Sequence, residues 1–370
     1  MAFKDISVVL YDGAIKLDYK DKAHRYYVRD RVDFDLPESD PKAWSKIKYP
    51  KGTTTLLGDV LEKKALMTWP MGLALRELFG FYDFKNENGE QMTGFSKDVG
   101  TIWGATITQE ELLPVVLSAS IAWQRKQKKG ADIGSVVHDA IEHHVRANPN
   151  KLVPDFDKDG EPIPDTEHLP DLVNSEFDIA EAYNWLIKES EFESEAAEEK
   201  AWEEAPHDVA CAEAAFAEFK KWWAENRPEL VAAEELVYSR KHNVSGTFDA
   251  IIKLNGKTIL VDWKTSNASM NKDAAMPEGI SYQYFIQDGI YALAWEEMHT
   301  KDGAIAVDDI IDEVGVVSCR KDGGFSVIFG GDLGFEVNEV KTVAEGVINI
   351  YEFIKKCKDG LWERRPKEEK

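Results

Sequence analysis

The residues best suited to chemistry are two aspartates and a lysine near a predicted tight turn. Asn255-Gly256 separates two apolar runs, and this dipeptide strongly favours a two-residue type I′ hairpin. In that register Leu254 pairs with Lys257, and Asp249 faces Asp262. Opposed carboxylates repel one another, because directly paired residues have Cβ atoms only about 5 Å apart. A divalent cation is the simplest explanation for such a pair, since hard cations prefer carboxylate oxygens.

Lys264 is expected on the same surface as the two aspartates. Side chains alternate along a strand, so Asp262 and Lys264 share a face and Trp263 points to the other. Lys264 would lie opposite Thr247. A solvent-exposed salt bridge at a strand end is the alternative interpretation, and the in-register Asp249 favours a functional site over it.

The elements that must hold these residues form an alternating series after Pro228. Turn-flanked apolar runs predict strands, and helical spacing predicts two helices. The expected strands are 236–239, 246–254, 258–264, 314–319 and 325–329, and the expected helices are 280–298 and 338–356. This order predicts an α/β (α+β) fold with a mixed central β-sheet flanked by helices.

The first 227 residues have a different character. Residues 1–60 predict short strands and turns, with residues 51–55 turning into a helix, and the spacing over 59–79 and 109–147 predicts helices. Four prolines among acidic residues predict a loop over 150–172. Residues rich in alanine and glutamate predict helices over 173–227, with Trp222 and Trp223 in their core.

These patterns divide the chain into four predicted regions. Residues 1–118 form an N-terminal strand and helix region packed on the core. The core itself comprises 119–150 and 228–335. An acidic helical insertion spans 151–227, and a C-terminal helix with a basic tail spans 336–370.

The net charge of −23 is unusual for a protein that binds nucleic acid, but it is unevenly distributed. Residues 151–235 hold 25 acidic and 7 basic residues, a net of −18, which leaves −5 for the rest of the chain. That acidic segment is either a solvated face or a surface for a basic partner. The basic run of Arg125, Lys126, Lys128 and Lys129 either contacts phosphate or is itself a solvated face.

Composition also bears on the protein's environment. The N-terminus lacks the pattern of a secretory signal, and no run approaches the ~18 uncharged apolar residues of a membrane span. We therefore expect a soluble, cytoplasmic protein. The cysteines Cys211, Cys319 and Cys357 lie far apart, which predicts buried, unpaired thiols and no iron–sulfur cluster.

Four motifs together resemble the RecB-like branch of the PD-(D/E)XK nucleases. They are Gly134-x-x-x-His138, Gly246-x-x-Asp249, Asp262-x-Lys264-Thr265 and Gln287-x-x-x-Tyr291, in the order of that branch. Phe248 stands where other members have proline. A softer resemblance, through His24–Val28 and Thr53–Leu57, is to phage-encoded exonucleases. The resemblance implies a restriction-endonuclease-like core with a helical insertion.

The resemblance also implies roles for the motif residues. Asp249 and Asp262 would bind Mg²⁺ or Mn²⁺, as two ions, with the carbonyl of Trp263. Lys264 would activate water and stabilise the developing charge, and His138 would be a further metal ligand or catalytic residue.

Other roles remain open. One of the two adjacent glutamates, Glu234 or Glu235, would support the metal, and strand alternation cannot choose between them; Glu234 fits the spacing better. Gln287 and Tyr291 would contact the DNA backbone or brace the catalytic strand, and Thr265 would also contact DNA.

The function implied is that of a metal-dependent DNA nuclease, foremost a phage-type exonuclease acting on linear duplex DNA in recombination or DNA processing. A structure-specific endonuclease with the same site and a non-catalytic DNA-end or protein-interaction module are the alternatives. The expected partners are DNA and a single-strand annealing protein, with a homo-oligomer as a further expectation. If the chain is phage-encoded, it would act in the host cytoplasm.

Overall fold

The computed structural model describes most of the chain outside residues 62–133. The described residues are 5–23, 25–61, 81–85, 91–95, 134–156, 162–180, 182–183, 195–266, 280–320 and 325–363. The chain divides into two compact units: Met1–Leu61 with Gly134–Lys370, and Glu62–Ile133. In the second unit the described residues form an antiparallel hairpin of β5 (Phe81–Lys85) and β6 (Gln91–Phe95).

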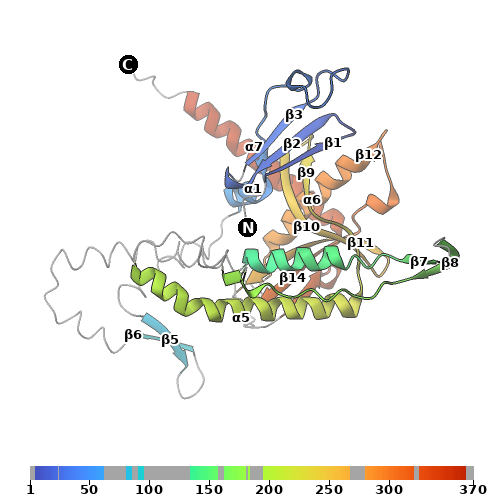
Figure 1. Cartoon of the computed structure of the whole chain (residues 1–370). Coiled ribbons are helices and arrows are strands. Elements are labelled where there is room, and N and C mark those ends of the chain that lie inside the picture. The colour runs from blue at the N-terminus through green and yellow to red at the C-terminus, as the bar shows by residue number, and fades with distance from the viewer. Residues whose placement is uncertain are drawn as a thin grey trace. The chain divides into compact units, whose positions relative to one another are not determined.

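A mixed six-stranded sheet lies at the centre of the first unit (Figure 1). Its strands are β4 (Lys51–Gly52), β9 (Glu229–Ser239), β10 (Val244–Leu254), β11 (Lys257–Ser266), β14 (Glu313–Arg320) and β15 (Phe325–Phe329). The order is β15-β14-β11-β10-β4, with β9 also pairing with β10. Strand β11 runs parallel to β14 and antiparallel to β10. All eight residues of β14 are buried, as expected of a parallel strand covered on both faces.

The turn between β10 and β11 has the predicted type and register. Asn255 has φ 52° and Gly256 has φ 76°, which is the left-handed pair of a type I′ turn. Leu254 pairs with Lys257, and the ladder continues to Ala250 and Val261. The described ladder ends there, so the next residues, Asp249 and Asp262, lie where the two strands begin to separate.

Helices cover the sheet on both faces. The helix α6 (Tyr282–His299) begins at Ser281, whose hydroxyl accepts a hydrogen bond from the Gln283 N–H, and its apolar side chains enter the core with those of β10, β11 and β14. The helix α5 (Glu195–Asn226) lies on the other side, where Phe219 contacts Trp263 with ring centroids 5.2 Å apart. Asp262 and Lys264 therefore face α6 while Trp263 faces α5. The predicted fold class, a mixed sheet flanked by helices, is confirmed.

Further helices complete the first unit. The helix α1 (Thr53–Val60) follows β4, and α7 (Val337–Glu363) packs against α6. Residues 134–147 are also helical, and His144 in this helix contacts Phe216 of α5 edge-to-face. Shorter elements are η1 (Asp21–Ala23), η2 (Pro41–Ala43), η5 (Val307–Asp309), η6 (Gly330–Leu333), β12 (Thr300–Lys301) and β13 (Ala304–Ile305).

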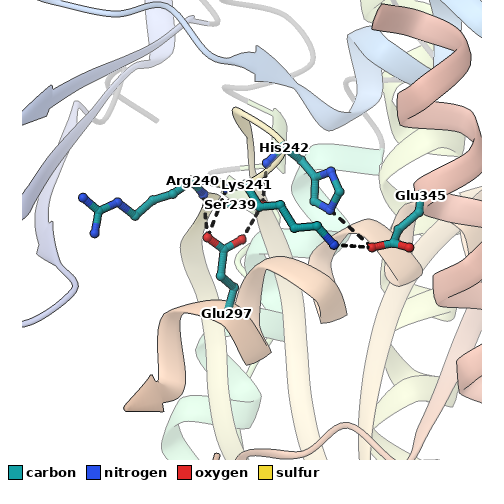
Figure 2. Close-up of polar contacts among 6 residues, drawn as sticks. All are labelled: Ser239, Arg240, Lys241, His242, Glu297 and Glu345. Atoms are coloured by element: carbon teal, nitrogen blue, oxygen red, sulfur yellow. Dashed lines mark hydrogen bonds and ion pairs between the residues drawn. The ribbon is translucent and has the colours of Figure 1, made fainter. Parts of the chain in front are cut away.

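Two glutamates, one on α6 and one on α7, contact the turn between β9 and β10 (Figure 2). Glu297 of α6 accepts hydrogen bonds from the Ser239 hydroxyl and from the N–H groups of Arg240 and Lys241. Glu345 of α7 pairs with the Lys241 ammonium at 2.7 Å. These contacts hold the turn that joins β9 to β10.

The N-terminal residues form a separate antiparallel sheet of β1 (Ile6–Leu10), β2 (Ile15–Lys20) and β3 (Arg25–Asp30). Ile15, Leu17 and Val28 from this sheet pack on Leu236 and Tyr238 of β9. The predicted turn into a helix near residue 51 is confirmed, since β4 joins the central sheet and leads directly into α1.

Two expectations for the middle of the chain are wrong. Residues 150–172 are not only a loop, because β7 (Val153–Phe156) and β8 (Pro162–His168) form an antiparallel hairpin. Both strands are edge strands, where proline can be accommodated without breaking a ladder on two sides. The helical prediction for 173–227 holds for α5, but residues 173–178 have no regular secondary structure.

Several other expectations fall outside the described residues, namely the helices over 62–79 and 109–133. Among the thiols, Cys319 is buried as expected, but Cys211 on α5 is only partly buried and Cys357 on α7 is exposed. Cys357 lies in the last part of that helix, where residues 355–361 are all exposed. No helix within the described ranges has the length and apolar character to cross a membrane.

Candidate active site

Asp249 and Asp262 lie at the point where β10 and β11 separate. The Trp263 N–H donates a hydrogen bond to Oδ2 of Asp249 at 2.6 Å, so the aspartate rather than a backbone carbonyl satisfies that group. The side chain of Asp262 is only 2% exposed, and its Oδ2 lies 2.5 Å from Nζ of Lys264. Two carboxylates and one ammonium therefore share one surface of the sheet.

His138 and Glu234 complete this group from two other elements. One ligand atom each from His138, Glu234 and Asp249 can be chosen so that all three lie within 4.8 Å of one another. Nδ1 of His138 lies 3.9 Å from Oδ2 of Asp249. Helix 134–147 is tied to β9 nearby, since Arg146 donates to the carbonyl of Ala233 at 2.6 Å.

Glu234 reaches the site through a distortion of β9. Its φ is 50°, a left-handed conformation that costs about 1–3 kcal/mol in a residue other than glycine. On either side of it, Ala233 pairs with Ala250 and Glu235 pairs with Phe248. Glu234 thus lies at the position facing Asp249, whereas Glu235 is exposed. The structure places Glu234, and not its neighbour, in the cluster.

The carboxylates are short of positive charge. Burial, together with the charges of Asp249 and Glu142, raises the pKa of Glu234 to about 9. Burial likewise raises the pKa of Asp262 to about 7, although Lys264 opposes that shift, and it raises the pKa of Asp249. Carboxylates whose ionised forms are disfavoured this strongly are typical of a site that a cation completes.

The pKa values of the two basic groups, His138 and Lys264, shift in opposite directions. Burial and the nearby Lys264 charge lower the pKa of His138 to about 4, so its imidazole is neutral at pH 7 and can act as a metal ligand. Burial alone would lower the pKa of Lys264, but the charges of Asp262 and Asp249 outweigh it and raise the pKa. Lys264 is therefore a permanent positive charge.

These donors fit a hard divalent cation. Asp249, Asp262 and Glu234 offer carboxylate oxygens, which Mg²⁺ and Mn²⁺ prefer, and His138 offers a neutral nitrogen that Mn²⁺ also accepts. The side chain of Trp263 is buried against Phe219, and a role for its carbonyl as a ligand stays a prediction.

Gln287 and Tyr291 brace Asp262 from α6. Nε2 of Gln287 lies 3.5 Å from Oδ1 of Asp262 and 3.1 Å from the Tyr291 hydroxyl. The two residues are 9% and 4% exposed. Of their two predicted roles, this burial favours bracing the catalytic strand over contacting DNA.

Two motif glycines permit close approaches between the elements of the site. A Cβ on Gly134 would lie 2.7 Å from Oγ1 of Thr265, and a Cβ on Gly246 would lie 2.3 Å from Cε1 of Tyr291. Thr265 is half-buried against helix 134–147, and its predicted DNA contact stays a prediction. Arg125, Lys126, Lys128 and Lys129 fall outside the described residues.

Sequence reasoning overlooked two residues here. Asp288 of α6 is fully buried, and neither of its carboxylate oxygens has a hydrogen-bond partner among the described residues. Its signal was an acidic residue inside an otherwise apolar helical stretch. Tyr26 of β3 bonds to the side chain of Thr247, and burial, partly offset by that bond, raises its pKa. The residue types of its segment predict a strand but give no sign of a contact with β10.

A comparison with protein-family models finds a match over the segment that holds the site residues. The model of the PD-(D/E)XK nuclease superfamily matches residues 117–332, more than half of the chain. No curated protein matches the chain. A solved structure described as "Crystal structure of SSO0001" is 16% identical over 42% of this chain and 66% of that one, with a TM-score of 0.23. This chain thus spans just under two thirds of that structure, and a TM-score so low says nothing about function.

Proposed function

The chain belongs to the PD-(D/E)XK nuclease superfamily, and we propose that within it the chain is a metal-dependent deoxyribonuclease of the RecB-like branch. The proposed substrate is linear duplex DNA, degraded from an end as phage-type exonucleases do. The observation that carries the proposal is the convergence of Asp249, Asp262 and Lys264, with His138 and Glu234 beside them.

The proposed reaction is hydrolysis of a phosphodiester. A water oxygen bonds to phosphorus, the ester bond to the leaving nucleotide oxygen breaks, and that oxygen gains a proton. When bound, Mg²⁺ or Mn²⁺ supplies charge stabilisation at the phosphate and a more acidic water. Asp249, Asp262 and Glu234 supply oxygen ligands, and neutral His138 supplies a nitrogen.

Lys264 is the side chain that would stabilise negative charge on the reacting phosphate. Its raised pKa keeps the ammonium charged across the neutral range. A compact point charge of this kind suits a phosphoryl oxygen that gains negative charge as water attacks. Gln287 keeps the Asp262 carboxylate oriented through its bond to Oδ1.

Linear and covalently closed duplex DNA distinguish the possible activities. With Mg²⁺ or Mn²⁺ we expect the chain to degrade linear duplex and to leave closed circles intact, and EDTA to stop the reaction. Cutting of closed circles would identify an endonuclease with the same site. Binding of DNA ends without cleavage would identify a non-catalytic module and contradict the proposal.

Other parts of the proposal come from the resemblance alone. They are a role in recombination or DNA processing, a single-strand annealing protein as partner, a homo-oligomer and two metal ions. The proposed cytoplasmic location rests instead on composition. Label placed at either the 5′ or the 3′ end of the duplex would report the polarity of digestion.

A further inference from the structure

Asp288 carries a buried carboxylate that no part of the proposed reaction explains. It is 0% exposed, and among the described residues neither oxygen has a hydrogen-bond partner. Burying an unpaired carboxylate is costly, so buried carboxylates are normally paired or hydrogen-bonded. We therefore expect a group that pairs with the Asp288 carboxylate in another state of the protein.

The position of Asp288 on α6 points to that partner. Tyr284, Gln287, Asp288 and Tyr291 follow the i, i+3, i+4, i+7 spacing of a single helix face. The Tyr284 ring lies 5.1 Å from Nζ of Lys264, and Gln287 reaches Asp262. Asp288 therefore lies on the face that covers the catalytic strand.

The electrostatics agree with this position. Burial raises the pKa of Asp288, the charges of Asp262 and Asp249 add to that shift, and the charge of Lys264 opposes it. In turn, the carboxylates whose charges act on Lys264 are Asp262, Asp249 and Asp288. The first two are proposed metal ligands, which leaves Asp288 as the one member of the three that remains available to the lysine.

The Lys264 ammonium and a metal ion would compete for the same carboxylate, and Asp288 offers the ammonium an alternative partner. In the structure its ammonium pairs with Oδ2 of Asp262, while Gln287 holds Oδ1. A cation bound by Asp262 must compete with the ammonium for Oδ2. A largely buried ammonium that loses its counter-charge is as unfavourable as an unpaired carboxylate.

We propose that Asp288 is a positioning residue that becomes the counter-charge of Lys264 when Asp262 binds a metal ion. The inference rests on the proposed nuclease function. Asp288 keeps the displaced ammonium on the catalytic surface, so that Asp262 is released to the metal and the lysine remains beside the substrate phosphate. It touches neither metal nor substrate itself.

Mn²⁺ binding to the full chain, measured by calorimetry, tests the inference independently of activity. Asp288→Asn keeps the size of the side chain but removes its charge, and we expect it to raise the Kd for Mn²⁺ by about tenfold. In a Lys264→Met background there is no ammonium to displace. There the same substitution should change the Kd by about twofold or less.

The matched control is Glu297→Gln on the same helix. Glu297 holds the β9–β10 turn through Ser239, Arg240 and Lys241 (Figure 2). We expect this variant to be less stable but to bind Mn²⁺ with unchanged Kd.

In activity assays Asp288→Asn should lower kcat with little change in KM, since the DNA contacts remain.

The outcomes separate the inference from the proposed function. An equal loss of Mn²⁺ affinity in both backgrounds, or no loss in either, overturns the role of Asp288. A wild-type chain that neither binds Mn²⁺ nor cleaves DNA contradicts the proposed function itself. Should Asp288→Asn not fold, Asp288→Ser gives the same comparison with a smaller side chain.

Discussion

Tyr291 on α6 lies so close to Gly246 on β10 that a Cβ built on the glycine would be 2.3 Å from Cε1 of the ring. The hydroxyl of the same ring accepts a hydrogen bond from Gln287, which also reaches Asp262. Residues of two motifs that are far apart in the sequence are therefore in contact, and the lack of a side chain at Gly246 allows this close approach.

Gly246→Ala should destabilise the protein, because the added methyl group overlaps a buried ring that cannot move freely. We expect a loss of about 1–3 kcal/mol in the free energy of unfolding, measured by urea titration. Gly346→Ala on α7 is the control, since no atom of the described residues would lie within 4 Å of its Cβ. That variant should be as stable as the wild type or gain up to about 1 kcal/mol. Equal stability of Gly246→Ala and wild type would contradict the packing described.

A second close approach predicts a rescue. Gly134→Ala places a Cβ 2.7 Å from Oγ1 of Thr265, so it should destabilise the contact between helix 134–147 and β11. Thr265→Ala removes the clashing oxygen and should restore part of that loss in the double variant. The measurement is a double-mutant cycle of unfolding free energies, in which neighbouring residues are not additive. Strict additivity of the two substitutions would argue against the contact.

The raised pKa of Glu234 predicts how stability depends on pH. Its folded-state value of about 9 exceeds the ordinary 4.5, so the folded chain binds this proton more tightly than the unfolded chain. Stability without metal should therefore fall as pH rises between those two values, by about 1.4 kcal/mol per pH unit for one proton. Thermal unfolding in EDTA from pH 6 to pH 9 measures this slope.

Glu234→Gln is the matched comparison for that slope. The net charge of −23 contributes self-repulsion to both proteins, so the difference between their slopes isolates the carboxylate. We expect a shallower slope in the variant. Identical slopes would mean that the carboxylate is not buried beside Asp249 as the structure places it.

Much of the core could be predicted from sequence because its signals are local. Asn255-Gly256 determines the turn type, and the turn determines the register as far as Ala250 and Val261. Alternation then places Asp262 and Lys264 on one face. The apolar runs of β14 and β15 and the helical spacing of α6 are equally local, which is why the fold class follows from them.

The remaining features depend on contacts between distant segments. The alternation of side chains along a strand cannot choose between Glu234 and Glu235, because Glu234 enters the site only through a left-handed backbone conformation. No glycine in the sequence indicates that conformation. The prolines of β7 and β8 predict a loop, yet they fit a two-stranded hairpin. Asp288 is inconspicuous in sequence, since its significance arises from being buried with no hydrogen-bond partner in the described part of the chain.

The most direct test of the central claim is the cleavage of end-labelled linear duplex DNA by wild type and Lys264→Ala under single-turnover conditions with Mn²⁺. The Lys264 ammonium pairs with Asp262, so its loss removes the ammonium proposed to stabilise the reacting phosphate. We expect the variant to fold and to bind DNA, and its cleavage rate to fall by about a hundredfold or more. Cleavage by Lys264→Ala at the wild-type rate would contradict the account.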